Sequence, residues 1–165
     1  MNLPRISWWQ RIIQRLASIE MISSRFLAKY LHRMDGAVLR WTKGKKSLTT
    51  MLTGLPLVIL STVGANTGIT RNTLLAGFPD DEKIILIPTS YGSKKHPDWY
   101  HNLRAHPNVH LQQNDHRQKY IARIAESDER EKYWQLAVYY FPGYMAYEER
   151  SGGREIPIIL LEPES

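Results

Sequence analysis

The chain has 165 residues, of which 42% are hydrophobic and 23% are charged. This length fits one compact domain, and the composition is too apolar for a disordered chain. The chain contains no cysteine, which excludes disulfides, thiolate catalysis and cysteine-ligated metal clusters.

The net charge of +6 is unevenly distributed along the chain. Residues 1–50 contain ten Lys and Arg against two Asp and Glu, whereas the remaining residues contain twelve against fourteen. The positive excess therefore belongs to an N-terminal segment. We expect no nucleic-acid partner, because a domain that binds nucleic acid usually carries its basic residues over the whole folded body.

The N-terminal segment has the pattern of an amphipathic basic helix. Apolar residues recur at three- and four-residue steps from Trp8 to Met34, with Arg, Lys and Gln between them. Two interpretations remain open. The apolar stripe packs on the body or on the partner subunit of a homodimer, or it contacts a membrane surface through Trp8 and Trp9. We expect a helical extension over residues 1–50 and one domain over residues 51–165.

No segment has the pattern of a membrane span. The longest apolar runs, Leu55 to Leu60 and Ile156 to Leu161, are far shorter than the roughly 20 residues that cross a bilayer. The arginines of the N-terminus are also unlike a secretory signal. We therefore expect a cytoplasmic protein, with peripheral contact at the inner face of the membrane under the second interpretation of the N-terminal helix.

Short strands with turn residues between them follow, which predicts a mainly β domain with helices. The expected hairpin connections are Pro79-Asp80-Asp81 and Asn114-Asp115. Helices are predicted over Asp98 to Ala105, between two prolines, and over Ser127 to Tyr140, with Ser127 as N-cap. Six such strands indicate a small closed or partly closed barrel. The expected strands are Leu57–Thr62, Asn72–Phe78, Lys83–Thr89, Val109–Gln113, Gln118–Ala125 and Ile156–Glu162.

Several common catalytic motifs are missing from the chain. It has no Gly-x-Ser-x-Gly elbow, no P-loop and no Gly-x-Gly-x-x-Gly. His96, His101 and His106 are five residues apart, and Pro97 and Pro107 bracket the helical part, so the rings do not converge. We therefore expect no metal site.

Two polar segments have the residue types that grip an anion. Gly64 to Arg71 joins two strands and offers glycines, hydroxyls, an amide and a guanidinium. Thr89 to Leu103 passes two lysines and enters a helix. The alternative interpretation is structural: a polar hairpin loop with a surface arginine, and a helix whose Trp99 and Leu103 anchor it in the core. Phe141 to Tyr147 holds three aromatic residues, which line a pocket for a flat substrate or form the rim of the core.

The order and spacing of these segments resemble the deazaflavin-dependent nitroreductase family. The resemblance covers roughly residues 31 to 163, through LHRMDGAVLR, LPLVILSTVGANTGITRNTLL, TSYGSKKHPDWYHNL and IPIILLEP. It implies a six-stranded split β-barrel of the FMN-binding-like superfamily, α+β in class. It also implies coenzyme F420, a deazaflavin with a phosphate and an oligoglutamate tail, as cofactor.

The resemblance further assigns residues to the cofactor and to the substrate. It places the phosphate and tail on Asn66, Thr67, Gly68 and Arg71, and the ring along Leu74, Leu75 and Ala76, beside Thr89, Ser90, Trp99 and Asn102. It places the substrate beside Phe141, Tyr144 and Tyr147. Where relatives usually have Arg-Lys, this chain has Ala65-Asn66, and Lys94 or Lys95 would then supply the missing charge.

The activity implied is hydride transfer from the reduced deazaflavin to a flat, electron-poor acceptor such as a quinone or a nitroaromatic. Tyr144 would orient the acceptor or donate a proton as the catalytic residue. Two alternatives remain: the same fold with FMN, which lacks the glutamate tail, and a non-catalytic carrier of a deazaflavin or lipid.

Overall fold

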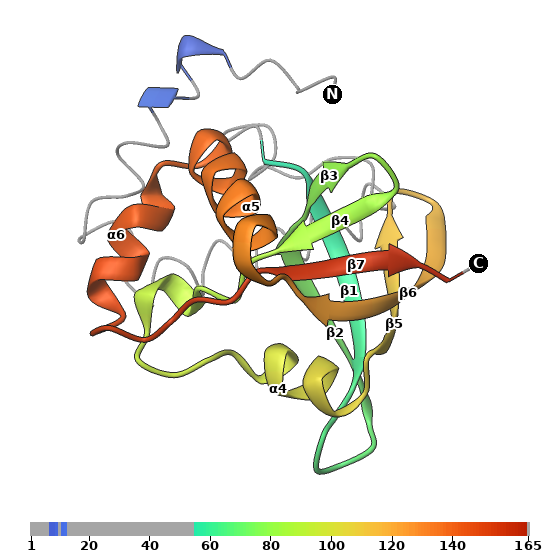
Figure 1. Ribbon diagram of the computed structural model, residues 1–165. Helices are drawn as coiled ribbons and strands as arrows, with labels where there is room; N and C mark the ends of the chain where they lie inside the picture. Colours follow the sequence, from blue (N-terminus) through green and yellow to red (C-terminus); the bar gives the residue numbers. More distant parts are fainter. Residues whose placement is uncertain (1–6, 10, 13–54, 165) are drawn as a thin grey trace.

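The computed structural model describes residues 7–9, 11–12 and 55–164. Its main element is a seven-stranded sheet in the order β2-β1-β5-β6-β7-β4-β3, with antiparallel pairing throughout. The sheet curls strongly, with α5 and α6 packed at one side and α4 near the β1–β2 hairpin (Figure 1). The predicted α+β class with a partly closed barrel is confirmed.

The elements have the following bounds. The strands are β1 (Leu57–Val63), β2 (Thr70–Ala76), β3 (Phe78–Asp80), β4 (Lys83–Leu86), β5 (Asn108–Gln113), β6 (His116–Ile124) and β7 (Ile159–Pro163). The helices are the short 3-10 turn η1 (Ser90–Gly92), α4 (Asp98–Ala105), α5 (Ser127–Tyr140) and α6 (Gly143–Arg150).

The two predicted helices have the predicted bounds, since α4 and α5 begin and end where the prolines and the acidic first turn indicate. The predicted N-cap of α5 was wrong. Ser127 is itself the first helical residue, Glu126 occupies the cap position, and no side chain caps the helix by a hydrogen bond. The acidic residues Asp128 and Glu129 lie in the first turn, where they favour the positive end of the helix dipole.

The predicted strand count of six was wrong, because Gly77 divides one expected strand into β2 and β3. Its amide donates to the carbonyl of Pro56 (2.9 Å), and a Cβ there would lie 2.8 Å from Val58 Cγ2 and 3.0 Å from Ile84 Cγ2. The chain therefore turns at Gly77 in close contact with two other strands. β2 pairs with β1, and the short β3 forms the hairpin with β4.

The predicted hairpin connection at Pro79-Asp80-Asp81 was wrong, because Pro79 and Asp80 belong to β3 and pair with β4, which leaves Asp81 and Glu82 in the turn. The strand predicted to run from Lys83 to Thr89 ends at Leu86.

Two further segments also differ from the sequence-based expectation. The segment after Phe141 had no assigned helix, yet it forms α6. The last strand begins at Ile159 instead of Ile156, and Pro157 lies before it. By contrast, the hairpin at Asn114-Asp115 is confirmed, because β5 ends at Gln113 and β6 begins at His116.

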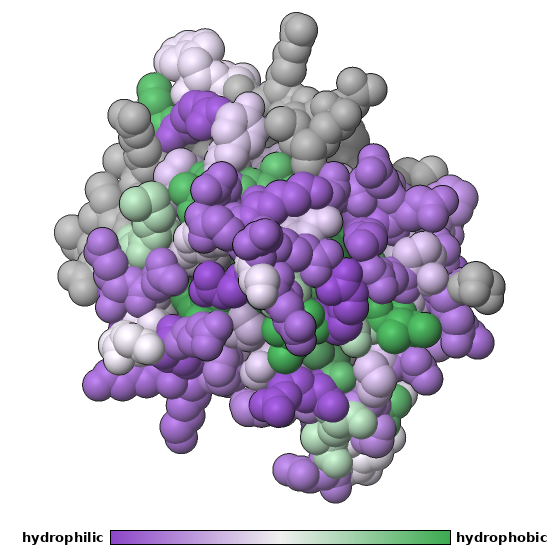
Figure 2. Space-filling view, in the orientation of Figure 1, coloured by the Kyte–Doolittle hydropathy of each residue, from purple (hydrophilic) through white to green (hydrophobic). Residues whose placement is uncertain are grey.

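Successive residues of β4 and of the first half of β7 are buried, so these strands are covered on both faces, and alternate residues of β4 belong to different cores. Ile85 of β4 packs with residues of α5 and α6, whereas Ile84 and Leu86 pack with Trp99 and Leu103 of α4. This explains the nearly continuous apolar runs of β4 and β7. The outer face seen in Figure 2 is mainly hydrophilic, with small separated hydrophobic patches.

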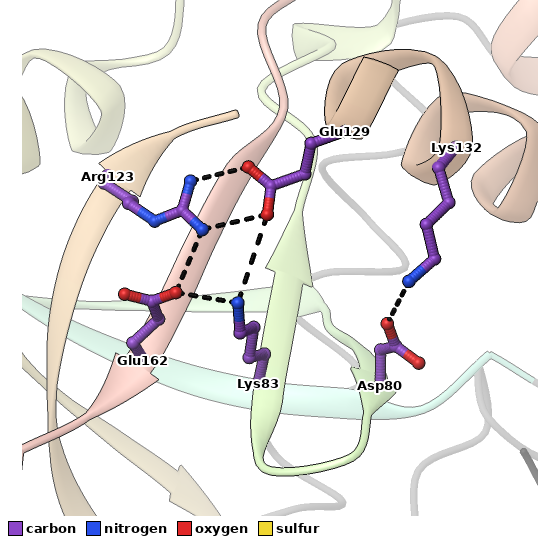
Figure 3. A network of polar contacts seen from close by, with 6 residues as sticks. All are labelled: Asp80, Lys83, Arg123, Glu129, Lys132 and Glu162. Carbon is purple, nitrogen blue, oxygen red and sulfur yellow. Dashed lines mark hydrogen bonds and ion pairs between the residues drawn. The ribbon is translucent and has the colours of Figure 1, made fainter. Parts of the chain in front are cut away.

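An ion-pair network ties α5 to the sheet (Figure 3). Arg123 of β6 makes two hydrogen bonds to Glu129 of α5 (2.6 and 2.9 Å) and one to Glu162 of β7 (2.9 Å). Lys83 Nζ lies 2.8 Å from Glu162, and Lys132 pairs with Asp80 at 2.9 Å. Four elements beside α5 are thus held by charge-assisted contacts.

Most of the predicted N-terminal helix and the boundary at residue 50 lie outside the described residues. Trp8, Trp9 and Ile12 are described and exposed. The guanidinium of Arg11 lies 5.3 Å from the ring centroid of Tyr139 in α5. Among the described residues, no helix combines the length and the apolar character that crossing a membrane requires.

Candidate functional site

The first predicted segment, Gly64 to Arg71, forms the tip of the β1–β2 hairpin. Its backbone amides are largely used within the loop: Gly64 donates to Ile69, and Thr67 and Gly68 donate to the carbonyl of Gly64. Gly68 has a φ of +65°, a conformation that glycine adopts without strain. A group bound here would therefore meet exposed side chains more than free amides.

Asn102 connects this loop to the second predicted segment. Its side-chain Nδ2 donates to Thr62 Oγ1 at the end of β1 (3.1 Å), and its Oδ1 accepts from the amide of Ala65 (3.0 Å). The side chain is 7% exposed. The loop after β1 and helix α4 therefore lie side by side, although 37 residues separate the hydrogen-bonded pair.

The chain between β4 and α4 contains an unusual turn. Ser90, Tyr91 and Gly92 are consecutive residues with positive φ, at 50°, 55° and 77°. Ser90 and Tyr91 carry side chains, and the left-handed region of backbone conformation is normally unfavourable for such residues. Thr89 precedes the turn and is buried, and Ser90 is half-buried.

Arg154, which no sequence motif indicated, contacts both ends of this turn. Its Nε donates to the carbonyl of Ser93 (3.0 Å), and its two terminal nitrogens donate to the carbonyls of Pro88 (3.3 Å) and Thr89 (2.8 Å). It also lies 2.8 Å from His96 Nδ1. Its only sequence signal is a position shortly before the last strand, so only the tertiary contacts identify it.

The environment of His96 and Arg154 disfavours protonation of both. Burial, followed by the positive charge of Arg154, lowers the pKa of the His96 imidazole. Burial also lowers the pKa of the Arg154 guanidinium, which nevertheless remains charged. A neutral His96 accepts a hydrogen bond at Nδ1 from Arg154, and its ring lies 4.5 Å from that of Tyr100 in α4.

The predicted ring-binding residues Leu74, Leu75 and Ala76 belong to β2, which is an edge strand of the sheet. These three residues pair with Ile59, Val58 and Leu57 of β1 on one side. On the other side, no described strand pairs with β2, and the three residues are half-buried. Their outer backbone groups are thus a candidate surface for hydrogen bonds to a planar ring.

The predicted substrate-side aromatics pack against one another. Ring centroids of Phe141, Tyr144 and Tyr147 lie 5.4 to 6.0 Å apart, and each residue is 6% or 7% exposed. Burial raises the pKa of Tyr144 well above its ordinary value and raises that of Tyr147 to about 12. Both hydroxyls therefore keep their protons at neutral pH.

The turn lies next to these aromatics. Tyr91 and Tyr147 contact edge to face at 6.1 Å, and a Cβ on Gly92 would lie 3.0 Å from the carbonyl oxygen of Tyr147. Trp99 is 6% exposed in the core beneath α4, whereas Lys94 is exposed. Contacts thus link the hairpin loop to α4, and the turn to α6.

A surface groove of about 360 Å³ lies elsewhere, between α5 and α6. It includes none of the predicted site residues. Its lining residues are Trp134, Gln135, Val138, Met145, Glu148 and Glu149.

Comparisons with known proteins identify the family of the chain. Residues 31–163 match the family model described as F420H(2)-dependent quinone reductase. A curated F420H(2)-dependent quinone reductase of Mycobacterium tuberculosis is 28% identical over 146 residues, which cover 84% of this chain and 96% of the relative.

Two solved structures are similar in sequence and fold. A structure described as an F420-H2 dependent reductase has a TM-score of 0.60 and 35% identity, over 65% of this chain and 94% of that one. Another, described as a domain-swapped dimer, has a TM-score of 0.62 and 30% identity, over 82% of this chain and 98% of that one.

The curled antiparallel sheet and these likenesses define the class as an oxidoreductase with an α+β fold like the split barrel. Because the family model matches most of its length, the chain belongs to the F420H(2)-dependent quinone reductase family. It is an oxidoreductase with coenzyme F420 as its cofactor, and the predicted resemblance is confirmed.

Proposed function

We propose that this protein reduces a quinone with F420H2 held between the hairpin loop, the edge of β2 and the turn before α4. The observation that carries the proposal is the bridge that Asn102 makes between Thr62, Ala65 and α4. This bridge brings the loop ending at Arg71 beside the helix that follows the turn. Such a pairing of polar loop and strand edge suits an anionic, flat cofactor.

The residues present fit the anionic part of the cofactor. Asn66, Thr67 and Arg71 have exposed side chains at the hairpin tip, and Arg71 forms no ion pair with a described residue. A guanidinium grips phosphate or carboxylate by two parallel hydrogen bonds. Gly68 allows the tight loop. Lys94, an exposed residue whose side chain lies near Gly152, would supply a further cation in place of the Arg-Lys pair that Ala65-Asn66 lacks.

The ring would lie along the outer edge of Leu74 to Ala76, with Thr89 and Ser90 as hydrogen-bonding groups. Trp99 and Asn102 are buried, so they would support the ring from the protein side instead of enclosing it. When bound, the reduced deazaflavin supplies the hydride. The protein's part is to orient ring and acceptor and to exclude water.

On the substrate side, Phe141, Tyr144 and Tyr147 would form the apolar wall beside the quinone. Tyr144 would donate a hydrogen bond to the acceptor oxygen, because a phenol is protonated at neutral pH. Tyr144 is only 6% exposed, so its hydroxyl would become accessible to an acceptor only if the neighbouring side chains move. A nitroaromatic is a second acceptor of the same flat, electron-poor kind.

We further propose a homodimer and a membrane-surface contact through residues 1–34. The exposed Trp8 and Ile12, 76% and 49% exposed, have the apolar character that inserts at a lipid interface. Sedimentation with anionic liposomes tests the lipid contact, and molar mass in solution tests the dimer. Liposome attachment that survives deletion of residues 1–34 would contradict the proposed lipid contact. A monomer at all concentrations would contradict the proposed homodimer.

The central experiment is a side-by-side titration of the purified protein with F420 and with FMN, followed by turnover of F420H2 with menadione. We expect F420 to bind more tightly than FMN and menadione to reoxidise F420H2. If the protein bound FMN but not F420, FMN would be its cofactor. If it bound F420 but turned over no quinone, it would be a carrier.

The role of Arg71 is tested by Arg71→Ala, with Arg117→Ala as control because Arg117 is an exposed arginine on the other hairpin. Loss of one charge-assisted contact of about 1.5–3 kcal/mol should weaken F420 binding about 10- to 100-fold. The loss should shrink at high salt. Equal affinities of the two variants would remove Arg71 from the site.

A further inference from the structure

The turn that carries Thr89 and Ser90 requires support from outside its own sequence. Two side-chain-bearing residues in the left-handed region are unfavourable and persist only where the surroundings fix them. Within the turn there are two short hydrogen bonds, from Gly92 to Thr89 and from Ser93 to Ser90, each 3.0 Å. They close the turn locally but do not anchor it to the rest of the fold.

Arg154 provides that anchor through the shape of its guanidinium. The planar group reaches Pro88 and Thr89 before the turn and Ser93 after it, with donors on three different nitrogens. A lysine ammonium at the same place is a single point charge, and it lacks the rigid, planar set of donors that the guanidinium provides. The contacts join residues 61 to 66 positions apart, so they are tertiary.

The charge of Arg154 is not used by an acidic partner. Among the described residues, no carboxylate pairs with it, whereas its neighbour Glu155 pairs with Arg130 (3.6 Å). Its fourth contact is the neutral ring of His96, which leads into α4. All four of these contacts are therefore directed at the chain between β4 and α4.

We propose that Arg154 is a positioning residue for the cofactor: its guanidinium fixes the turn Ser90–Gly92 and ties it to His96, so that Thr89 and Ser90 meet the deazaflavin ring in one orientation. This inference rests on the proposed function, because that function places Thr89 and Ser90 at the ring. Loss of the fork then weakens cofactor binding more than it weakens the fold as a whole.

The test uses the full chain with Arg154→Lys, Arg154→Met and a matched control, Arg130→Met. Arg130 is also half-buried and contacts the same C-terminal segment, at Glu155 and the carbonyl of Ile156, but not the turn. We expect F420 to bind about tenfold or more weakly to both Arg154 variants and within about twofold of the parent affinity to Arg130→Met. Urea midpoints are measured on all four proteins.

A second readout needs no cofactor. In the parent protein, the NMR signals of the His96 ring should show an Nδ1 that accepts a hydrogen bond. In Arg154→Met they should shift, and the pKa of His96 should rise because a neighbouring cation is gone. A further variant, Arg154→Ala, serves only for chemical rescue: addition of millimolar guanidinium ion should recover part of its F420 affinity.

The outcomes separate the two proposals. If the parent protein binds F420 and the Arg154 variants bind it equally well, the positioning role is overturned and the proposed function stands. Affinity losses that merely follow the urea midpoints, or an equal loss in Arg130→Met, also overturn it. If the parent protein does not bind F420, the proposed function fails and the positioning role fails with it.

Discussion

At the scale of the residue, Asn102 has the clearest structural effect. A buried primary amide that both donates and accepts is costly to remove, because the hydroxyl of Thr62, which is 1% exposed, loses this partner and stays buried. The substitution Asn102→Leu introduces a side chain of similar size and removes both hydrogen bonds of the amide at once. We expect a loss of about 1–3 kcal/mol in unfolding free energy, measured by urea denaturation. Asn108→Ala, on an exposed residue at the start of β5, should change it by less than about 0.5 kcal/mol.

Gly92 gives a second test at this scale, with Gly153 as its control. Both have strongly positive φ, 77° and 83°, but a Cβ on Gly92 would lie 2.9 Å from Arg150 Cβ, whereas nothing lies within 4 Å at Gly153. Gly153→Ala should cost only the backbone strain, about 1–2 kcal/mol. Gly92→Ala should cost clearly more by thermal unfolding, because α6 must also move. Equal losses would show that the contact between the turn and α6 is loose.

At the scale of the element, the network around α5 gives a pH dependence with a definite sign. Hydrogen bonds from Arg123 and Lys83 lower the pKa of Glu162 to about 2, and Arg123 lowers that of Glu129. Because these folded-state values lie below the unfolded value of about 4.3, the network stabilises the fold above that pH. The stabilisation is lost as the pH falls toward 2. Partial exposure limits it to about 0.5–1 kcal/mol per pair.

Glu162→Gln should therefore lower stability at pH 7 and have a clearly smaller effect near pH 2.5, where most of the stabilisation is already lost. The measurement is the urea midpoint at both pH values. Glu126→Gln is the control, since Glu126 is exposed and forms no ion pair with a described residue. A parallel decrease for Glu162→Gln at both pH values would assign the effect to packing instead of charge.

At the scale of the whole molecule, the two cores share the same strands, so they should unfold together. Ile85 and Leu86 are adjacent in β4 and fully buried, yet they face different cores. Ile85→Ala and Leu86→Ala should each cost about 2–5 kcal/mol within a single transition. Coincident urea curves from tryptophan fluorescence and far-ultraviolet circular dichroism check this. Two separate transitions in either variant would show that α5 and α6 detach independently.

The sequence by itself determined the elements whose signals are local, and it also determined the family. Proline placement set the bounds of α4, Asn114-Asp115 set one hairpin, and the spacing from Thr62 to Leu103 indicated a deazaflavin enzyme. Backbone geometry and turn chemistry act over a few residues, so such features can be read from the chain.

Only the tertiary structure decided the features that depend on distant contacts. Gly77 separates β2 from β3 because Val58 and Ile84 crowd it, and no neighbouring residue signals this. The candidate site depends on the same kind of contact. Asn102 meets Thr62 and Arg154 meets Thr89 only because the curled sheet brings them together. The free energy of such contacts depends on packing and burial, which spacing along the chain does not encode.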